Sequence, residues 1–158
     1  QAAFIPLMST KFRPQAIRQF YKAWKTDRLV IDKWFALQII YCNPNDATEI
    51  AKKLSAHKDF DFKNPNRVRS LISSFCSGNP AGFHDLTGNG YKFTADWIIT
   101  IDRINPQTAA KLCTAFQSWK NYDKNRRNKS KEQLNRILLT ANLSRDTKEM
   151  IDRIVSKA

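Results

Sequence analysis

Apolar side chains recur along this chain at the spacing of an α-helix wherever a period can be read. The clearest stripe follows Pro65, with members at positions i, i+3, i+4, i+7 and i+8. Its residues are Val68, Leu71, Ile72, Phe75 and Cys76. A second stripe follows Pro106 and consists of Ala109, Leu112, Cys113 and Phe116. No segment alternates apolar and polar residues for long between turn signals, so the pattern predicts an all-α protein.

Capping signals mark where several helices begin. Asn64-Pro65 and Asn105-Pro106 each place a side chain that accepts a free backbone N–H before a proline that suits the first turn. Asp46 and Glu49 have the spacing of a capping box, in which two side chains satisfy orphan backbone N–H groups. We therefore expect helices to begin at these three places.

About eight helices are predicted in all. Five span roughly 14–26, 29–42, 46–57, 91–104 and 123–140, and three others begin near residues 64, 105 and 144. Short links favour antiparallel pairs, and pairs stacked side by side form a helical solenoid of the armadillo or HEAT kind. The segments 29–42 and 91–104 are apolar on several faces, so we expect both to be central helices.

The length of the chain sets the domain organisation. A chain of 158 residues supports one sizeable core, and no composition shift marks a second, so we expect a single helical domain over 1–158. The longest mainly apolar run, 29–41, contains Asp32, Lys33 and Gln38 and is shorter than the roughly 20 residues that a membrane-spanning helix requires. We expect no membrane partner.

The compartment follows from the first residues and the cysteines. The first ten residues lack a basic start, an apolar stretch and a small-residue cleavage site, so no secretory signal is predicted. Cys42, Cys76 and Cys113 each lie among apolar residues at helical spacing, as buried thiols do in a reducing compartment. We expect a cytoplasmic protein without a disulfide.

The basic charge of the chain raises nucleic-acid binding as a possible function. Twenty-seven basic against fourteen acidic side chains give a formal net charge of +13. The densest basic block runs from Lys120 to Arg136, and such a surface is typical either of nucleic-acid binding or of a solvated helix face. Both interpretations stay open at this point.

Catalytic motifs are missing from the sequence. The two histidines, His57 and His84, do not form the His-Glu-x-x-His pattern of a zinc helix, and no Cys-x-x-Cys occurs. His84 beside Asp85 has no serine or cysteine at a strand-to-helix elbow, so a structural or capping role is expected for it. The glycines of residues 77–91 are not followed by Gly-Lys-Ser/Thr, so no phosphate loop is predicted there.

Five strings in order resemble a known family. They are DKWFALQ at 32–38, FDFKNPNRVRSLI at 60–72, GNPAGFHD with GNGYKF at 78–93, DRINPQTAAKL at 102–112, and NLSRD at 142–146. Together they resemble the C-terminal helical domain of bacterial zinc aminopeptidases of the aminopeptidase N (alanyl aminopeptidase) type. The resemblance covers about Phe20 to the end, and residues 1–13 are not placed by it.

The resemblance implies a role within a larger enzyme. The parent would remove N-terminal amino acids from peptides, using zinc held in a catalytic domain that carries His-Glu-x-x-His. None of the family's zinc ligands or catalytic residues has a matching position here. The implied partners are the catalytic and N-terminal domains of the same polypeptide and the peptide substrates, with nucleic acid an unlikely partner. The chain itself would be a non-catalytic cap that walls the active-site chamber and controls peptide access.

Three basic residues are candidates for lining that chamber. Arg67 and Arg69 lie at the two rims of the first apolar stripe, and Lys111 lies opposite the second. A cationic wall suits peptides, because the far end of a peptide is a carboxylate. Arginine can hold a carboxylate with two parallel hydrogen bonds. The alternative is that Arg67 and Arg69 pair with carboxylates such as Asp59 or Asp61 and join helices.

The glycine-containing stretch 77–91 is predicted to be a structured loop at a domain interface or at the chamber edge. Its candidate residues are Gly78, Phe83, His84, Gly90 and Tyr91, with Phe83 and Tyr91 as anchors. The competing hypothesis for the whole chain is a stand-alone basic helical-repeat protein that binds nucleic acid or serves as a scaffold.

Overall fold

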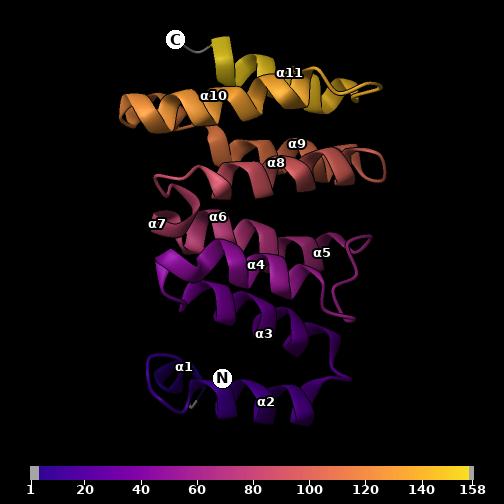
Figure 1. Cartoon of the computed structure of the whole chain (residues 1–158). Helices are drawn as coiled ribbons and strands as arrows, with labels where there is room; N and C mark the ends of the chain where they lie inside the picture. Colours follow the sequence, from indigo (N-terminus) through magenta and orange to yellow (C-terminus); the bar gives the residue numbers. More distant parts are fainter. Residues whose placement is uncertain (1–3, 157–158) are drawn as a thin grey trace. The chain divides into compact units, whose positions relative to one another are not determined.

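The computed structural model describes residues 4–156, and within that range it contains helices and connecting turns but no strand (Figure 1). The all-α prediction is therefore confirmed. The chain divides into two compact units, one ending at Gly82 and one beginning at Phe83. The sequence marks no boundary there, and the single domain over 1–158 stays a prediction.

The first unit places α3 at its centre. Its elements are α1 (Phe4–Leu7), α2 (Arg13–Trp24), α3 (Arg28–Ile40), η1 (Pro44–Asp46), α4 (Ala47–Ser55), α5 (Pro65–Val68), η2 (Arg69–Ser73) and α6 (Ser74–Gly78). Helix α3 packs against α2, α4, η2 and α6 (Figure 1). Its buried residues include Phe35, Leu37 and Ile39, and Leu37 lies about 200° around the helix from Phe35, so more than one face is buried. The prediction that 29–42 is a central helix is confirmed within this unit.

The helix after Asn64 contains an element that the sequence does not predict. Asn64 caps α5 by accepting the Asn66 N–H at 3.0 Å, as expected. Residues Arg69–Ser73 then form a π-helical turn, η2, in which the Ser74 N–H reaches back to the Arg69 carbonyl. All five residues of the apolar stripe are nevertheless buried, because α3 and α4 both pack against this helix.

The capping box at Asp46 is a wrong prediction. Asp46 has a helical conformation, and its side chain makes no capping hydrogen bond. The helical segment already begins three residues earlier, at Asn43. The Asn43 side chain accepts the Asn45 N–H at 3.0 Å, and Pro44 opens a 3-10 turn. This turn leads directly into α4, so Asp46 lies inside a continuous helical segment and is not at its start.

The second unit is organised around α8. Its elements, after α7 (Pro80–Phe83), are α8 (Asn89–Asp102), α9 (Pro106–Cys113), η3 (Thr114–Phe116), η4 (Trp119–Asn121), α10 (Lys124–Leu138) and α11 (Arg145–Ser156). Helix α8 packs against α9 and α10, and α9 packs against α11 (Figure 1). The predicted central position of 91–104 is thus confirmed within this unit. Asn105 caps α9 at the Thr108 N–H, 2.9 Å away, as the sequence predicts.

None of the helices in the described range is both long enough and apolar enough to cross a bilayer. The predicted burial of Cys42, Cys76 and Cys113 is confirmed, and all three are free thiols.

Candidate functional site

The Arg67 guanidinium is buried inside the first unit. Its Nε donates to Asp32 Oδ1 at 2.6 Å, and its Nη1 donates to the Asp59 carbonyl. The guanidinium carbon also lies 5.1 Å from the centre of the Phe35 ring. Arg67 is only 6% exposed, so these contacts occupy it and join α5 to α3. This geometry favours the pairing hypothesis for Arg67, with a partner that the sequence analysis did not name.

Asp32 was missed because its partner lies 35 residues away. The sequence does contain an indication that Asp32 is paired, since it is the single carboxylate within the mainly apolar run 29–41. An acidic residue in such a run needs a basic partner when it becomes buried. The Asp59 carboxylate, which the sequence suggests as a partner alongside Asp61, instead accepts a hydrogen bond from the Tyr21 hydroxyl at 2.6 Å.

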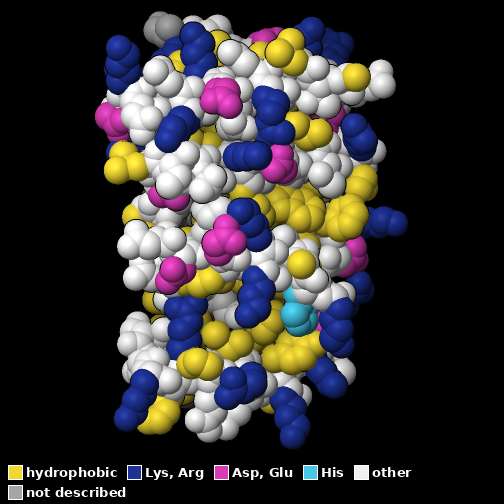
Figure 2. Space-filling model, in the orientation of Figure 1, with side chains coloured by type: hydrophobic (Ala, Val, Ile, Leu, Met, Phe, Trp, Pro, Cys, Tyr) yellow, Lys and Arg dark blue, Asp and Glu magenta, His cyan; other side chains and the backbone are white. Residues whose placement is uncertain are grey.

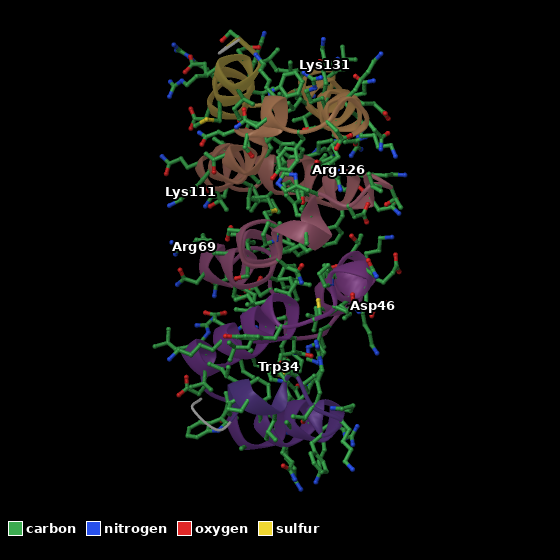
Figure 3. All side chains as sticks on the ribbon, turned by 90° about the vertical axis from the view of Figure 1, so that its left-hand side faces the viewer. Trp34, Asp46, Arg69, Lys111, Arg126 and Lys131 are labelled. Carbon is green, nitrogen blue, oxygen red and sulfur yellow. The ribbon has the colours of Figure 1, made fainter. Side chains whose placement is uncertain are left out.

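Arg69 has a different environment. Its side chain is exposed (Figure 3), and its guanidinium donates to the Asn66 side chain one turn earlier. Within residues 4–156 no carboxylate lies within ion-pair distance of it. Its remaining N–H groups are therefore available to an external acceptor.

Lys111 is exposed on α9, as predicted, but its surroundings carry both signs of charge. It lines a hollow of about 380 Å³ together with Arg153, and Asp146 and Glu149 from α11 also line it. A mixed lining differs from the cationic wall that the sequence predicts. The chamber-lining role of Arg67, Arg69 and Lys111 stays a prediction, and the geometry supports it best for Arg69.

The first half of the 77–91 stretch is fixed to the end of α3. The Asn79 amide donates to the carbonyls of Ile39 at 3.0 Å and Cys42 at 3.1 Å, and its oxygen accepts the Gly82 N–H. A Cβ at Gly78 would lie 2.6 Å from Ile40 Cγ1, so a larger residue here would force the Ile40 side chain to move. The segment is ordered by specific contacts within the first unit.

The second half of this stretch is held by an aromatic cluster in the second unit. His84 Nδ1 lies 2.8 Å from the Tyr91 hydroxyl, and the imidazole stacks on Tyr122 with ring centres 3.9 Å apart. Arg126 donates to the His84 carbonyl. Burial, reinforced by the charge of Arg126, lowers the pKa of His84 to about 4, and burial raises the pKa of Tyr91. His84 is therefore neutral near pH 7. Its hydrogen bond to Tyr91 holds the loop against α8.

Two glycines shape the start of α8. Gly88 has a φ of +76°, which most side chains avoid. A Cβ at Gly90 would lie 2.4 Å from the Phe83 carbonyl oxygen, so glycine permits the loop to approach the helix. Phe83 itself packs edge-on against Tyr91, with ring centres 5.2 Å apart. The loop is thus structured, and its position at a domain interface stays a prediction.

Much of the basic block on α10 and its flank is used within the second unit. Lys120 donates to the Val155 carbonyl, Lys129 to the Leu86 carbonyl, and Arg136 pairs with Asp96 at 2.7 Å. Arg126 pairs with Asp123 at 2.6 Å. Within residues 4–156, three side chains of this block make no described hydrogen bond or ion pair, namely Lys124, Arg127 and Lys131. The paired residues weaken the case for a continuous nucleic-acid surface.

A zinc site does not fit this part of the chain. Across residues 4–156 no group of three or more His, Cys, Asp or Glu side chains comes together. His57 and His84 belong to different units, and each ring packs among aromatic side chains. We therefore derive no metal chemistry from these residues.

The packed helix pairs define an α-helical repeat protein, and its described residues contain no group of side chains that could hold a metal ion. The chain belongs to the family described as "Domain of unknown function (DUF3458_C) ARM repeats", whose model matches residues 2–156. This match begins well before Phe20 and so corrects the expected extent of the resemblance. It also supports the predicted helical solenoid.

The relatives are aminopeptidases. Aminopeptidase N of Caulobacter vibrioides is 43% identical over 141 residues, which is 89% of this chain and 16% of that protein. Aminopeptidase N of Haemophilus influenzae is 39% identical over 141 residues, and that of Escherichia coli is 35% identical over 144. The crystal structure of Legionella pneumophila aminopeptidase A in complex with aspartic acid matches with a TM-score of 0.89 and 37% identity, covering 99% of this chain and 18% of that one. The chain thus corresponds to a small segment of aminopeptidase N-like enzymes.

Proposed function

We propose that this chain is the non-catalytic C-terminal domain of a cytoplasmic zinc aminopeptidase N, where it walls the active-site chamber and controls peptide access. The observation that carries the proposal is the match of 89 to 91% of the chain to proteins named aminopeptidase N, of which it spans only 16%. Such coverage favours one domain of a larger polypeptide over a stand-alone nucleic-acid-binding or scaffold protein.

The chemistry belongs to the rest of the proposed parent. Zinc in its catalytic domain would activate water and polarise the scissile carbonyl while the N-terminal residue of a peptide is removed. The partners of this chain are then the other domains of the same polypeptide and the peptides that pass its surface. Its own contribution is to shape the chamber and to contact parts of the substrate far from the scissile bond.

Arg69 is the residue through which such contact is best tested. Its exposed guanidinium has free donors, and a peptide offers carbonyls and a terminal carboxylate as acceptors. Losing one charge-assisted hydrogen bond that is made equally in the ground and transition states raises KM while kcat is unchanged. We expect Arg69→Ala in the intact polypeptide to raise KM for peptides about tenfold.

The test compares two substrates and two variants. A small aminoacyl reporter reaches only the catalytic domain, so its KM should not change in Arg69→Ala. Arg28→Ala removes another exposed arginine of the same unit and serves as the matched control, with KM unchanged for both substrates. If activity on peptide and reporter falls together and the melting temperature drops, Arg69 is a structural residue and the chamber-wall role assigned to it is wrong.

A further inference from the structure

Helices α2, α3 and α4 enclose a hollow of about 460 Å³ within the first unit. This volume lies in the range of sites that bind small molecules, about 300 to 1,000 Å³. Figure 2 shows hydrophobic side chains and a histidine at the surface between basic side chains over this part of the molecule. The hollow is separate from the residues considered above as chamber lining.

One wall of the hollow is aromatic. Tyr21, Trp34 and His57 form a mutually packed trio, with ring centres 5.1 Å apart for Tyr21 and Trp34, and 5.2 Å for Trp34 and His57. Hydrogen bonds fix each ring. The Trp34 indole N–H donates to the Ile17 carbonyl at 3.0 Å, the Tyr21 hydroxyl to Asp59 at 2.6 Å, and His57 Nδ1 accepts the Asp59 N–H. These bonds hold the rings in place, which suits the stacking of a flat apolar group.

The other lining residues give the hollow a single sign of charge. Arg13, Arg18 and Lys53 line it, and no acidic side chain does. Within residues 4–156 none of the three has an ion-pair partner. Arg13 is held in place because its guanidinium donates to the carbonyls of Tyr41 at 2.8 Å and Gln38 at 2.9 Å. The charged side chains that line the hollow are therefore all basic, and the Asp59 carboxylate that bonds the Tyr21 hydroxyl is not part of the lining.

We propose that this hollow is a binding site for a small aromatic carboxylate, whose ring packs against Trp34 while its carboxylate contacts Arg18 and Lys53. Pro14, Ile17, Ile50 and Leu54 supply the apolar remainder of the lining. A carboxylate between two basic side chains at the edge of an apolar cavity gains charge-assisted hydrogen bonds that are stronger than neutral ones. This inference does not rest on the proposed aminopeptidase function, and no catalytic step is attached to it.

The experiment measures the affinity of 3-(4-fluorophenyl)propionate by fluorine NMR, using the intact polypeptide that carries this chain. The double variant Arg18→Glu with Lys53→Glu reverses the charge at the hollow. Lys22→Glu with Lys52→Glu is the matched control, since it makes the same charge change at exposed positions of the same two helices, outside the lining. The amide of the same probe tests the need for the carboxylate.

We expect the Arg18/Lys53 variant to weaken probe binding at least about tenfold and the control by less than about twofold, because long-range charge effects are screened at physiological salt. The amide should bind about tenfold more weakly than the acid. The milder pair Arg18→Gln with Lys53→Gln replaces the glutamate variant if that variant has a lowered melting temperature. The proposal is overturned if the unmodified polypeptide does not bind the probe, if both double variants bind alike, or if acid and amide bind equally.

Discussion

Replacing Arg67 by methionine should destabilise the first unit strongly while leaving substrate contacts untouched. Methionine keeps much of the apolar stem of the side chain but removes the guanidinium. The guanidinium bonds Asp32 at 2.6 Å, contacts the Asp59 carbonyl and lies over the Phe35 ring. The Arg67 and Asp32 side chains are only 7% and 17% exposed, so water replaces these interactions poorly.

The magnitude follows from these contacts. A charge-assisted hydrogen bond contributes about 1.5 to 3 kcal/mol, and a cation over an aromatic ring contributes about 0.5 to 2 kcal/mol. Removing Arg67 also leaves the Asp32 carboxylate largely buried without its partner. Breaking a buried pair in this way costs about 3 to 5 kcal/mol, and we expect a loss within that range for Arg67→Met.

The assay is denaturant unfolding of Arg67→Met, Asp32→Leu and the double variant, with amide hydrogen exchange to locate the change. Each single variant leaves one buried charge unpaired, whereas the double variant leaves none. The double variant should therefore lose less free energy of unfolding than the two singles together, by at least about 1 kcal/mol. Strictly additive losses, or faster exchange confined to residues after Gly82, would refute the assignment of Arg67 as a buried pairing residue.

Three other predictions test the two units. Phe75→Ala should lower the free energy of unfolding by about 3 to 5 kcal/mol and exposed Lys131→Ala by less than about 0.5, and an unmoved denaturant midpoint for Phe75→Ala would contradict the stripe. Burial lowers the pKa of His84 from 6.5 to about 4, so the unfolded chain binds a proton at higher pH than the folded one. The stability that this difference provides is complete above about pH 6.5 and is lost as pH falls towards 4, and His84→Gln should flatten this part of a pH series of thermal melts. Gly90→Ala should lower the melting temperature, because its Cβ meets the Phe83 carbonyl at 2.4 Å, and a raised melting temperature would show that the loop can move aside.

Much of the fold was predictable because helix periodicity and capping are local properties. The stripe from Val68 to Cys76 is buried throughout, and Asn64 and Asn105 cap the helices that follow them. The wrong capping box at Asp46 has a local reason, since the chain turns earlier at Asn43-Pro44. The π turn η2 was not predictable from spacing, because the apolar positions from Val68 to Cys76 fit a regular α-helix.

Far less of the candidate site was predictable. Periodicity gives the face of a helix on which a side chain lies, but not which groups lie beside that face in another segment. Arg67 depends on Asp32, which is 35 residues away, and His84 depends on Arg126, which is 42 residues away. The hollow between α2, α3 and α4 combines residues from three separate segments, none of which has a recognisable motif.

The two neighbouring arginines show how this limit bears on function. With about 100° per residue, Arg67 and Arg69 lie at similar angles on either side of the apolar stripe, so the sequence treats them alike. The structure separates them, because Asp32 and Phe35 of α3 contact Arg67, whereas within residues 4–156 the described bond of the Arg69 guanidinium is to Asn66, one turn earlier. An effect of Arg67 variants on peptide hydrolysis should therefore follow the folded fraction and vanish well below the melting temperature. An effect of Arg69 variants on KM should persist there, since it would arise from contact with the peptide itself.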